Sequence, residues 1–380
     1  MQVPSAARWR GIDPRSALPG TKKSPMTDTQ ALMEQACTAD TLLARRVVLV
    51  GYGNQGRAHA LNLRDSGIQV TVTGRSGSNA RARAQMDGFQ TSDTDRAVVG
   101  ADLVIMALPD EVHAEVWTSA VAPHVNPGQT IGFIHGSSVH FGLVRIPDGI
   151  GAVLVAPKGP GTTLRERFTQ GQGIPALLAV AQERAPGTGE PTSHELARAW
   201  AAGLGCARAA VVRTTFGDEA ETDLFGEQAV LCGGMMGLAQ AAYETLVEAG
   251  YPPLLAYMEC VHEIKQVADL LYARGPAGMR AAISNTAEFG AYSAAPRMVD
   301  DATKTAMRTL LKEIKDGTFS RAMQADHDAG APWFRAQRAM ASAHPMEQAS
   351  ADVRALMPWL AAETTGGAAQ PISNQPARET

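Results

Sequence analysis

The feature that most constrains the fold is the segment LVGYGNQGRAHALNLRDSG at residues 49–67, which contains three closely spaced glycines. The run RRVVLV that leads into it is β-branched and apolar on both faces, which is typical of a strand inside a parallel sheet. Gly51 would allow a tight turn, Gly53 would let the backbone approach a pyrophosphate, and Gly56 would let the following helix pack on the strand. A purely structural glycine turn has the same spacing, but its place between a strand and a helix favours a dinucleotide site.

Later segments extend this pattern into a domain. IQVTVTG, ADLVIMALP and QTIGFIHG each predict a strand, with helical stretches between them, and from about residue 195 alanine-rich helical runs replace the strands. We therefore predict an α/β fold in which a Rossmann-type, doubly wound sheet at residues 27–208 precedes an all-α domain at residues 209–362. Residues 1–26, which are basic and rich in proline, are expected to form a disordered leader. Residues 363–380 lack apolar periodicity and are expected to form a disordered tail.

The end of the second predicted strand indicates which dinucleotide binds. An NAD site usually carries an acidic residue about 20 positions past the glycines. The corresponding stretch here, TVTGRSGSNARAR, contains no acid and offers Arg75 and Ser78 instead. Because a guanidinium can bind a 2′-phosphate through paired, charge-assisted hydrogen bonds, the sequence favours NADP. Arg81 and Arg83 either join this site or lie on a solvated helix face.

The second half of the chain contains two pairs of carboxylates. Asp223 with Glu227, and Glu259 with Glu263, are spaced i, i+4, so each pair projects from one face of a helix. Their neighbours are apolar, and like charges on such a face cost energy unless a cation neutralises them. Carboxylates without clustered cysteines or histidines favour Mg²⁺, and two ions could be held if one carboxylate bridges them. Two surface helices with ordinary acid pairs are the alternative.

Composition excludes several other classes of protein. A formal net charge of −4 gives no reason to expect a nucleic-acid partner. No apolar run reaches the roughly 18 residues that a membrane span requires. Widely spaced cysteines without a CxxC pair indicate reduced thiols and a cytoplasmic location. These cysteines are Cys37, Cys206, Cys232 and Cys260.

Two further residues follow predicted strands. His135 lies at the carboxyl end of one strand, and Lys158 lies in a Pro/Gly-rich loop after another. Open α/β sheets bind their ligands at this edge, so both residues are candidate site residues. A lone histidine is often structural, and only its position after a strand favours a role in the site.

Taken together, these segments resemble the short form of ketol-acid reductoisomerase, from about Arg46 to Leu360. The resemblance implies that an alkyl group migrates within a 2-hydroxy-2-acetyl acid such as acetolactate, and that NADPH then reduces the resulting 2-keto acid in branched-chain amino acid biosynthesis. It also implies two Mg²⁺ ions, a knotted helical domain, and a homo-oligomer, at least a dimer, whose active sites are shared between subunits. The strings that carry the resemblance are GYGNQGRAHALNLRDSG, LPDE, HGSSVHFG, APKGPG, TDLFGEQAVLCGG, ETLVEAGY, ECVHEIK, ISNTAEFG and MPWL.

The resemblance assigns a role to each matching residue. His135 is the implied proton carrier or water-ordering group, Lys158 is the implied catalytic lysine near the metals, and Ser284 holds the substrate carboxylate. Asp223 would bridge the two ions. The implied metal ligands are Asp223, Glu227, Glu259 and Glu263. The implied cofactor contacts are Gly51, Tyr52, Gly53, Asn54, Gln55, Gly56, Arg75, Ser78, Asp110, Glu111, Val112, His113 and Gly161.

The chain also departs from the family pattern without losing an implied metal ligand. These departures bear on substrate choice more than on reaction type, so a different acyl substrate in a specialised pathway is one alternative. A metal-free NADP-dependent hydroxyacid dehydrogenase and a non-catalytic NADP(H)-binding paralogue are the others. The departures are Ser137 and Ser138 in place of Phe-Asn, Ala80 in place of a serine, Thr162 in place of a histidine, and Ala291 and Ala295 in GAYSAAPR.

Overall fold

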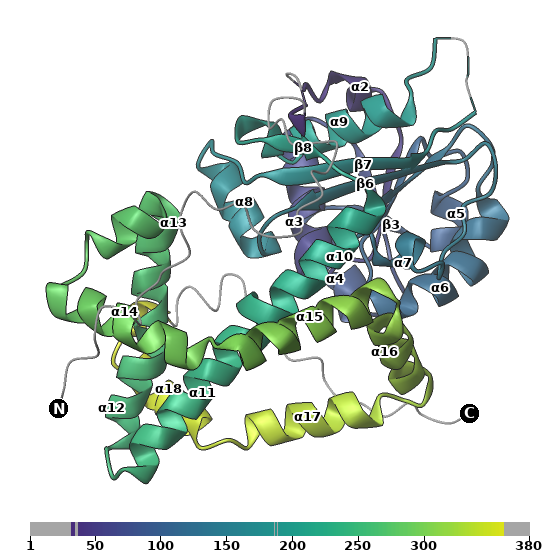
Figure 1. The fold of residues 1–380 in the computed structure, drawn as a ribbon. Coiled ribbons are helices and arrows are strands. Elements are labelled where there is room, and N and C mark those ends of the chain that lie inside the picture. Colours follow the sequence, from purple (N-terminus) through teal and green to yellow (C-terminus); the bar gives the residue numbers. More distant parts are fainter. Residues whose placement is uncertain (1–31, 35–36, 186, 188, 361–380) are drawn as a thin grey trace.

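The computed structural model describes residues 32–34, 37–185, 187 and 189–360, and it consists of a sheet-containing half and a helical half (Figure 1). The predicted leader at 1–26 and tail at 363–380 lie outside the described residues. Within the described chain, no helix is both long and apolar enough to cross a membrane.

The first half is built on one eight-stranded sheet with the order β3-β2-β1-β4-β5-β6-β7-β8. Neighbouring strands run parallel except β6 and β7, which are antiparallel, so β7 and β8 run opposite to the other six. The predicted strands are confirmed as β1, β2, β4, β5 and β6, the last being the strand expected before Lys158, whereas β3, β7 and β8 were not predicted. The strands are β1 (Val47–Val50), β2 (Val70–Thr73), β3 (Gln90–Ser92), β4 (Leu103–Met106), β5 (Thr130–Phe133), β6 (Gly151–Pro157), β7 (Ala176–Gln182) and β8 (Val211–Arg213).

Helices cover both faces of this sheet, as a doubly wound fold requires. Alternate residues of β1 enter opposite cores: Val47 and Leu49 pack with α3, α8 and α9, whereas Val48 and Val50 pack with α5 and the segment around Trp117. The strand is therefore apolar on both sides, as its sequence predicted. The helices of this half are α2 (Asp40–Leu43), α3 (Asn54–Asp65), α4 (Asn79–Met86), α5 (Thr94–Ala97), α6 (His113–Val116), α7 (Ser137–His140), α8 (Gly161–Thr169) and α9 (Ser193–Gly203).

The order of the strands reverses between β1 and β4, because β2 and β3 follow on one side and β5 and β6 on the other. Ligands of open α/β sheets bind outside the carboxyl ends of the strands at such a switch point. Gly51, Asp110, His135 and Lys158 lie on the loops that leave β1, β4, β5 and β6 at this edge. The topology thus gathers segments that are more than 100 residues apart in the sequence.

The glycine turn after β1 has the geometry that its sequence predicted. Gly51 has a φ of +99°, and a Cβ there would lie 2.5 Å from the carbonyl oxygen of Ala107. A Cβ on Gly56 would lie 2.6 Å from the carbonyl oxygen of Gly51. Around Gly53 the corresponding space is open, so the backbone there is accessible from outside. The first and third glycines are needed for packing, and the second leaves room for a ligand.

The second half is helical, as predicted, and it begins with α10, which extends away from the sheet (Figure 1). β8 lies just past the predicted boundary at 208/209 and completes the sheet before α10 starts. Two π-helical segments interrupt the α-helices, η6 (Glu227–Leu231) and η7 (Met258–His262). The α-helices are α10 (Phe216–Gly226), α11 (Gly233–Glu248), α12 (Pro253–Tyr257), α13 (Ile264–Arg280), α14 (Asn285–Met298), α15 (Asp301–Lys315), α16 (Thr318–Asp328), α17 (Pro332–Ser342) and α18 (Met346–Ala355).

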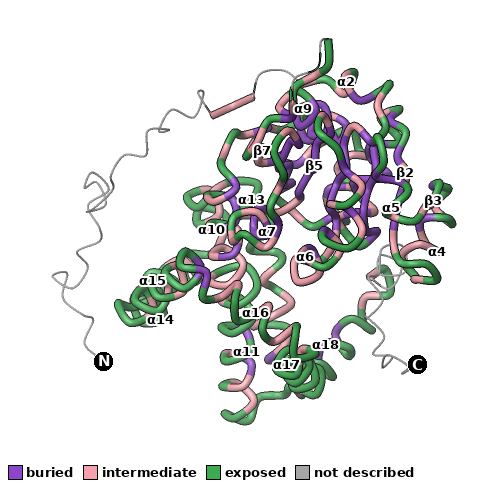
Figure 2. Tube along the Cα trace, turned by 90° about the vertical axis from the view of Figure 1, so that its right-hand side faces the viewer, coloured by how far each residue is buried: buried purple, intermediate pink, exposed green. Residues whose placement is uncertain are grey.

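The helical half is far more exposed than the sheet half, as Figure 2 shows by its green helices. Among the described residues, all but three of the exposed large apolar side chains lie between Val230 and Trp359. Examples are Leu271 on α13, Phe289 on α14 and Trp333 on α17. Large exposed apolar side chains in such number are characteristic of interaction surfaces.

Candidate active site

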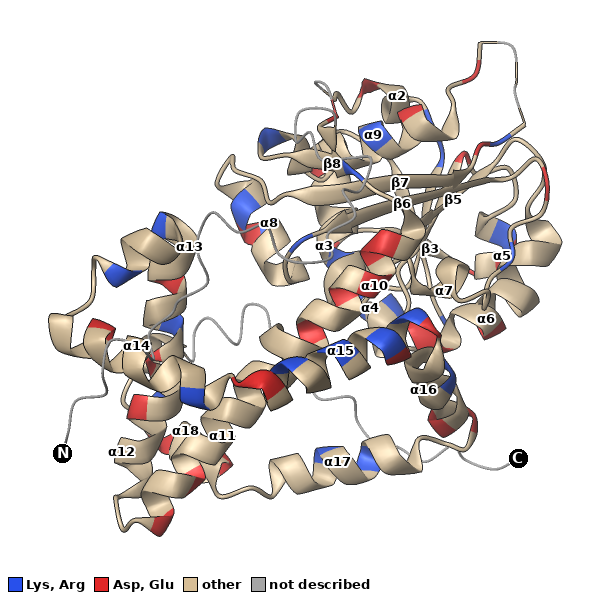
Figure 3. Cartoon of the chain, in the orientation of Figure 1, with Lys and Arg blue, Asp and Glu red and all other residues tan. Residues whose placement is uncertain are grey.

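A cavity of about 230 Å³ lies where the carboxyl ends of β5 and β6 meet α10. Several predicted site residues line it together: Gln55, Asp110, His135, Lys158, Asp223 and Glu227. Glu219 and apolar side chains, among them Ile134 and Leu224, complete the lining. Glu219 and Asp223 of α10 thus line a cavity at the edge of the sheet that the topology favours for ligands. Figure 3 shows the acidic positions along α10 in red.

A salt-bridged network joins β6 to α10 at the floor of this cavity. The ammonium of Lys158 donates hydrogen bonds to Glu219 Oε1 at 2.9 Å and to Asp223 Oδ1 at 2.8 Å. Glu219 is almost fully buried, and its second oxygen accepts a bond from the backbone N–H of Gly136 at 2.7 Å. Each oxygen of this buried carboxylate thus has a donor, which the burial of a charge requires.

His135 lies between two carboxylates at the mouth of the same network. Its Nδ1 is 3.4 Å from Asp110 Oδ2, and its Nε2 is 3.4 Å from Asp223 Oδ2 and 3.9 Å from Glu219 Oε2. These are ion-pair distances, and neither ring nitrogen has a closer hydrogen-bond partner among the described residues. The imidazole is therefore held by charge, with both nitrogens directed at acids.

The electrostatics of the cavity follow from this arrangement. Burial alone would favour a neutral imidazole, but Asp110 and Asp223 raise the pKa of His135 to about 10. Burial likewise opposes the charge of Lys158, but Glu219 and Asp223 raise its pKa. Contact with His135, and then with Lys158, holds the pKa of Asp223 well below its usual range although burial acts in the other direction. His135 and Lys158 are therefore cationic, and Asp223 between them is anionic.

Glu227 differs from the other acids because it has no cationic partner among the described residues. Burial, and then the charge of Asp223, raise the pKa of its carboxyl group. Glu227 opens the π-helical segment η6, and π-bulges inside α-helices are frequent at functional sites. An additional cation in this cavity would relieve the repulsion between Asp223 and Glu227.

The donor set suits a divalent cation. His135, Glu219 and Asp223 each offer one ligand atom, and these three atoms lie within 4.8 Å of one another. Asp223 and Glu227 line the same cavity, which agrees with the prediction that they share one helix face. Carboxylate oxygens in a partly solvated cavity are the ligands that Mg²⁺ prefers.

Three predicted residues lie outside this cavity within the single chain. Glu259 belongs to the π-helical η7, Glu263 caps α13, and Ser284 caps α14 by accepting a hydrogen bond from the N–H of Ala287. All three residues are exposed, and α13 and α14 lie well away from the sheet in Figure 1. Because Glu259 lies in a π-helix, the pair Glu259 and Glu263 does not sit on a regular α-helix as its spacing predicted.

The predicted dinucleotide residues border the other side of the switch point. Asn54 and Gln55 begin α3, and Gln55 Nε2 donates a bond to the carbonyl of Gly159 at 2.9 Å. A Cβ on Gly161 would lie 2.3 Å from the carbonyl oxygen of Asn54, so Gly161 is a packing requirement of this turn. Together these contacts fix the turn against the loop that carries Lys158.

The second predicted strand leads to an open, positively charged loop. Arg75 is exposed there, and no ion pair or hydrogen bond within the described chain engages its guanidinium. Ser78 caps α4 by accepting a bond from the N–H of Arg81 at 3.2 Å. Arg81 forms an ion pair with Asp93 at 2.7 Å. This favours the prediction that it lies on a solvated helix face over the prediction that it joins the cofactor site.

Two predicted cofactor contacts have side chains that point into the protein. The ring of Tyr52 is buried against Phe89, and its hydroxyl donates to Asp87 at 2.7 Å. His113 is buried, with Nε2 3.0 Å from the carbonyl oxygen of Leu108 and Nδ1 2.5 Å from the hydroxyl of Ser138. Ser138 is one of the departures noted in the sequence, and it ties the loop after β5 to the loop after β4.

Glu111 and Val112 complete this loop and are half-buried in the short helix η2 (Asp110–Val112).

Glu219 lines the candidate site but was not among the predicted site residues. It stands in the same acidic run as Asp223 and Glu227, and the three are spaced i, i+4, i+8. That spacing alone could have suggested that Glu219 shares their face, because such residues line one side of a helix. Its burial and its bonds to Gly136 and Lys158 come from other segments, and no local pattern indicates them.

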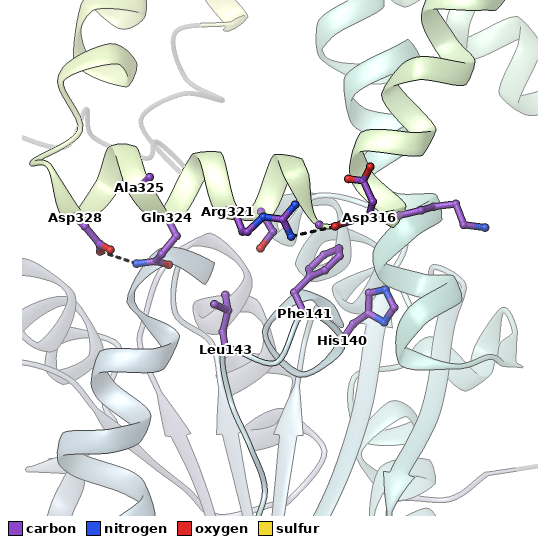
Figure 4. Close-up of a pocket in the computed structure, with 11 residues that line it drawn as sticks. His140, Phe141, Leu143, Asp316, Arg321, Gln324, Ala325 and Asp328 are labelled. Atoms are coloured by element: carbon purple, nitrogen blue, oxygen red, sulfur yellow. Dashed lines mark hydrogen bonds between the residues drawn. The ribbon is translucent and has the colours of Figure 1, made fainter.

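A larger cavity lies elsewhere in the described chain. It measures about 490 Å³ and lies between the loop that follows α7 and the helices α15 and α16 (Figure 4). His140, Phe141 and Leu143 face Arg321 and Gln324 across it, and none of the predicted site residues lines it. The concentration of charged partners therefore identifies the smaller cavity as the candidate active site.

Known proteins resemble this chain over most of its length. Residues 41–210 match the family model "Acetohydroxy acid isomeroreductase, NADPH-binding domain", and residues 216–359 match "Ketol-acid reductoisomerase, C-terminal domain". The chain is 44% identical over 329 residues to "Ketol-acid reductoisomerase (NADP(+))" of Sulfurimonas denitrificans, which covers 87% of this chain and 96% of that protein.

Solved structures give the same result. A structure described as an NADH-preferring ketol-acid reductoisomerase from an uncultured archean is 35% identical, with a TM-score of 0.82, covering 86% of this chain and 98% of that one. An NAD-binding semialdehyde dehydrogenase protein from Cupriavidus necator has a TM-score of 0.55 at 18% identity, covering 72% of this chain and 99% of that one. The latter likeness concerns the fold alone.

Proposed function

Since the chain belongs to the ketol-acid reductoisomerase family, we propose that it rearranges a 2-hydroxy-2-acetyl acid such as acetolactate by alkyl migration. It then reduces the resulting 2-keto acid with NADPH to a 2,3-dihydroxy acid, in branched-chain amino acid biosynthesis. The observation that carries the proposal is the network of Lys158, Glu219, Asp223 and His135 at the edge of the sheet next to the glycine turn. A metal-free dehydrogenase has no need of a carboxylate such as Glu227 facing this cavity.

The cavity is suited to Mg²⁺, with Asp223 and Glu227 as the ligands that this chain provides there. The support is chemical, because Glu227 is partly desolvated beside a second carboxylate and a divalent cation would neutralise both. When bound, Mg²⁺ supplies Lewis-acid polarisation of the substrate oxygens, and NADPH supplies the hydride. Titration calorimetry with Mg²⁺ tests the metal site separately from turnover.

Within the cavity, His135 and Lys158 have different tasks. The ring of His135 reaches Asp110 with one nitrogen and Asp223 with the other, so it can hold a proton at Nε2 next to the reacting oxygens and return it through water. Lys158 is fixed by two carboxylates, which keeps its charge at the cavity floor, where negative charge on the substrate is stabilised. Glu219 acts through both neighbours as a positioning residue.

NADPH is proposed to lie along the turn after β1, with its pyrophosphate at the amino terminus of α3 and its 2′-phosphate near Arg75 and Ser78. The free guanidinium of Arg75 and the exposed backbone at Gly53 support this placement. The relative described as NADH-preferring indicates that cofactor preference varies among similar proteins. The ratio of Michaelis constants for NADPH and NADH decides the question for this chain.

The complete site is proposed to need two subunits. Glu259, Glu263 and Ser284 are exposed and lie outside the cavity of their own chain, among helices that expose most of the large apolar side chains. Both features fit a homodimer, or a larger assembly, in which these residues enter the partner's cavity.

Coexpression of Asp223→Asn with Glu259→Gln tests this sharing. Each variant alone should be inactive. A mixed dimer, however, contains one site in which Asp223 from one subunit and Glu259 from the other are both wild type. Random pairing should therefore restore about a quarter of wild-type activity. No recovery in dimers that are shown to be mixed would place both carboxylate pairs in the same subunit's site.

The direct test of the function is simple. Protein, Mg²⁺ and acetolactate are mixed with NADPH, and the absorbance of the reduced nicotinamide is followed. A steady decline that needs all components supports the proposal, whereas no decline with correctly folded, NADPH-bound protein contradicts it. The acyl preference is compared with acetolactate and its ethyl homologue, because Ser137, Ser138, Thr162, Ala291 and Ala295 depart from the family pattern.

A cytoplasmic location also belongs to this proposal, and it is supported by four cysteines that form no disulfide in the described chain.

A further inference from the structure

Asp87 joins three side chains behind the glycine turn. One of its oxygens, Oδ2, accepts bonds from the hydroxyl of Tyr52 and from Nε of Arg57, each at 2.7 Å. The other oxygen accepts from the second guanidinium nitrogen of Arg57 at 3.1 Å, so Arg57 binds in the bidentate geometry. Arg64 adds a bond to the backbone carbonyl of Asp87 at 2.6 Å.

These contacts reach both sides of the segment that is proposed to bind the pyrophosphate. Tyr52 lies between Gly51 and Gly53, and Arg57 lies in the first turn of α3. Their common partner Asp87 terminates α4, which belongs to a different βα unit. One carboxylate therefore fixes the turn and the beginning of the helix relative to each other.

The side chains of the turn have few other restraints. Gly53 has open space around it and the side chain of Asn54 is exposed, although the backbone carbonyl of Asn54 contacts Gly161. The ring of Tyr52 is buried in T-shaped contact with Phe89, at a centroid distance of 5.8 Å, and its hydroxyl is bonded to Asp87. A pyrophosphate at a helix terminus needs several N–H groups aimed at one point, and their aim depends on this backbone.

We propose that Asp87 is a positioning residue for the cofactor, holding Tyr52 and Arg57 so that the glycine turn and the amino terminus of α3 are preorganised for the pyrophosphate. Asp87 does not contact the dinucleotide in this proposal. Since NADPH and NADH share the pyrophosphate, Asp87 should affect the affinity for both cofactors equally. Arg75 should affect only the affinity for NADPH, which carries the 2′-phosphate. The inference rests on the proposed cofactor site.

The test measures NADPH and NADH binding, by protein fluorescence, and steady-state kinetics in four variants of the full chain. Asp87→Asn should weaken the binding of both cofactors by about tenfold, because the bidentate ionic bond to Arg57 is lost. Tyr52→Phe, which removes one hydroxyl from an otherwise unchanged ring, should weaken both by a few-fold. In both variants the change should be larger in the KM for the cofactor than in kcat, since preorganisation acts on binding.

Asp65→Asn is the matched control. Asp65 also bonds two arginines, Arg64 and Arg165, but it lies at the opposite end of α3. The Asp65→Asn variant should leave the binding of both cofactors unchanged. The double variant Tyr52→Phe with Asp87→Asn should bind no worse than Asp87→Asn alone, because both changes break one network.

The outcomes separate the inference from the proposed function. Wild-type protein that does not bind NADPH would overturn both. Wild-type binding with equally tight binding by Asp87→Asn and Tyr52→Phe would overturn the inference alone. A loss confined to NADPH, or a fall in kcat and melting temperature without a change in affinity, would also overturn it, because either result assigns Asp87 a different role. If Asp87→Asn does not fold, the affinity of Tyr52→Phe decides.

Discussion

Replacing Glu219 by glutamine should disable the active site while leaving the cofactor site intact. The glutamate is 1% exposed, and its two oxygens accept from Gly136 N–H at 2.7 Å and from Lys158 Nζ at 2.9 Å. Glutamine has almost the same shape, but it turns an NH₂ group toward one of these two donors. One charge-assisted bond is therefore lost and replaced by a contact between two donors.

The expected magnitude follows from that single bond. A hydrogen bond to a charged group contributes roughly 1.5–3 kcal/mol. If the loss is expressed in the transition state, kcat/KM for acetolactate should fall by roughly 10- to 150-fold. The Kd for NADPH should not change, since neither Gly136 nor Lys158 belongs to the glycine turn.

The assay is NADPH oxidation with acetolactate and Mg²⁺, accompanied by a thermal melt to establish that the variant is folded. Glu221→Gln is the matched control, because Glu221 lies on the same helix and contacts His140 at 3.4 Å and Lys315 at 3.5 Å, away from the site cavity. The control should stay within about twofold of wild type. A folded Glu219→Gln protein with wild-type kcat/KM would refute the reasoning that this buried carboxylate positions Lys158.

Three other predictions concern separate parts of the molecule. Asp223→Asn should abolish turnover of acetolactate and weaken Mg²⁺ binding in calorimetry while NADPH binding is retained. Equal Mg²⁺ binding by the wild-type and Asp223→Asn proteins would contradict the metal assignment. Arg75→Ala should raise the Michaelis constant for NADPH by roughly tenfold or more and leave that for NADH unchanged, because a charge-assisted phosphate contact contributes about 1.5–3 kcal/mol. Burial lowers the pKa of His59 to about 3. The His59 imidazole therefore stays neutral in the folded state, whereas in the unfolded chain it binds a proton below the ordinary pKa of 6.5. Stability should therefore fall as the pH drops from about 6.5 toward 3, and His59→Leu should reduce the loss between pH 7 and pH 5, measured by urea unfolding, by about 2 kcal/mol.

What the sequence determined is local. The β-branched run before Gly51 predicted β1, and the glycine spacing predicted a turn whose first and third glycines the structure requires for packing. The spacing of Asp223 and Glu227 predicted that they face the same way, and both line one cavity. These inferences succeed because a strand or helix has a fixed period, so neighbours in the sequence decide which side chains share a face.

Tertiary structure decided which faces meet. Lys158 and Glu219 are 61 residues apart, and only the packing of α10 on the carboxyl end of β6 makes them partners. Other tertiary contacts bury Tyr52 against Phe89 and His113 against Ser138, and Glu259 and Glu263 lie outside the cavity. Periodicity within one element contains no information about the distance to another. That distance is set by the sum of many nonlocal contacts, so the network around Glu219 appears only when the whole chain has folded.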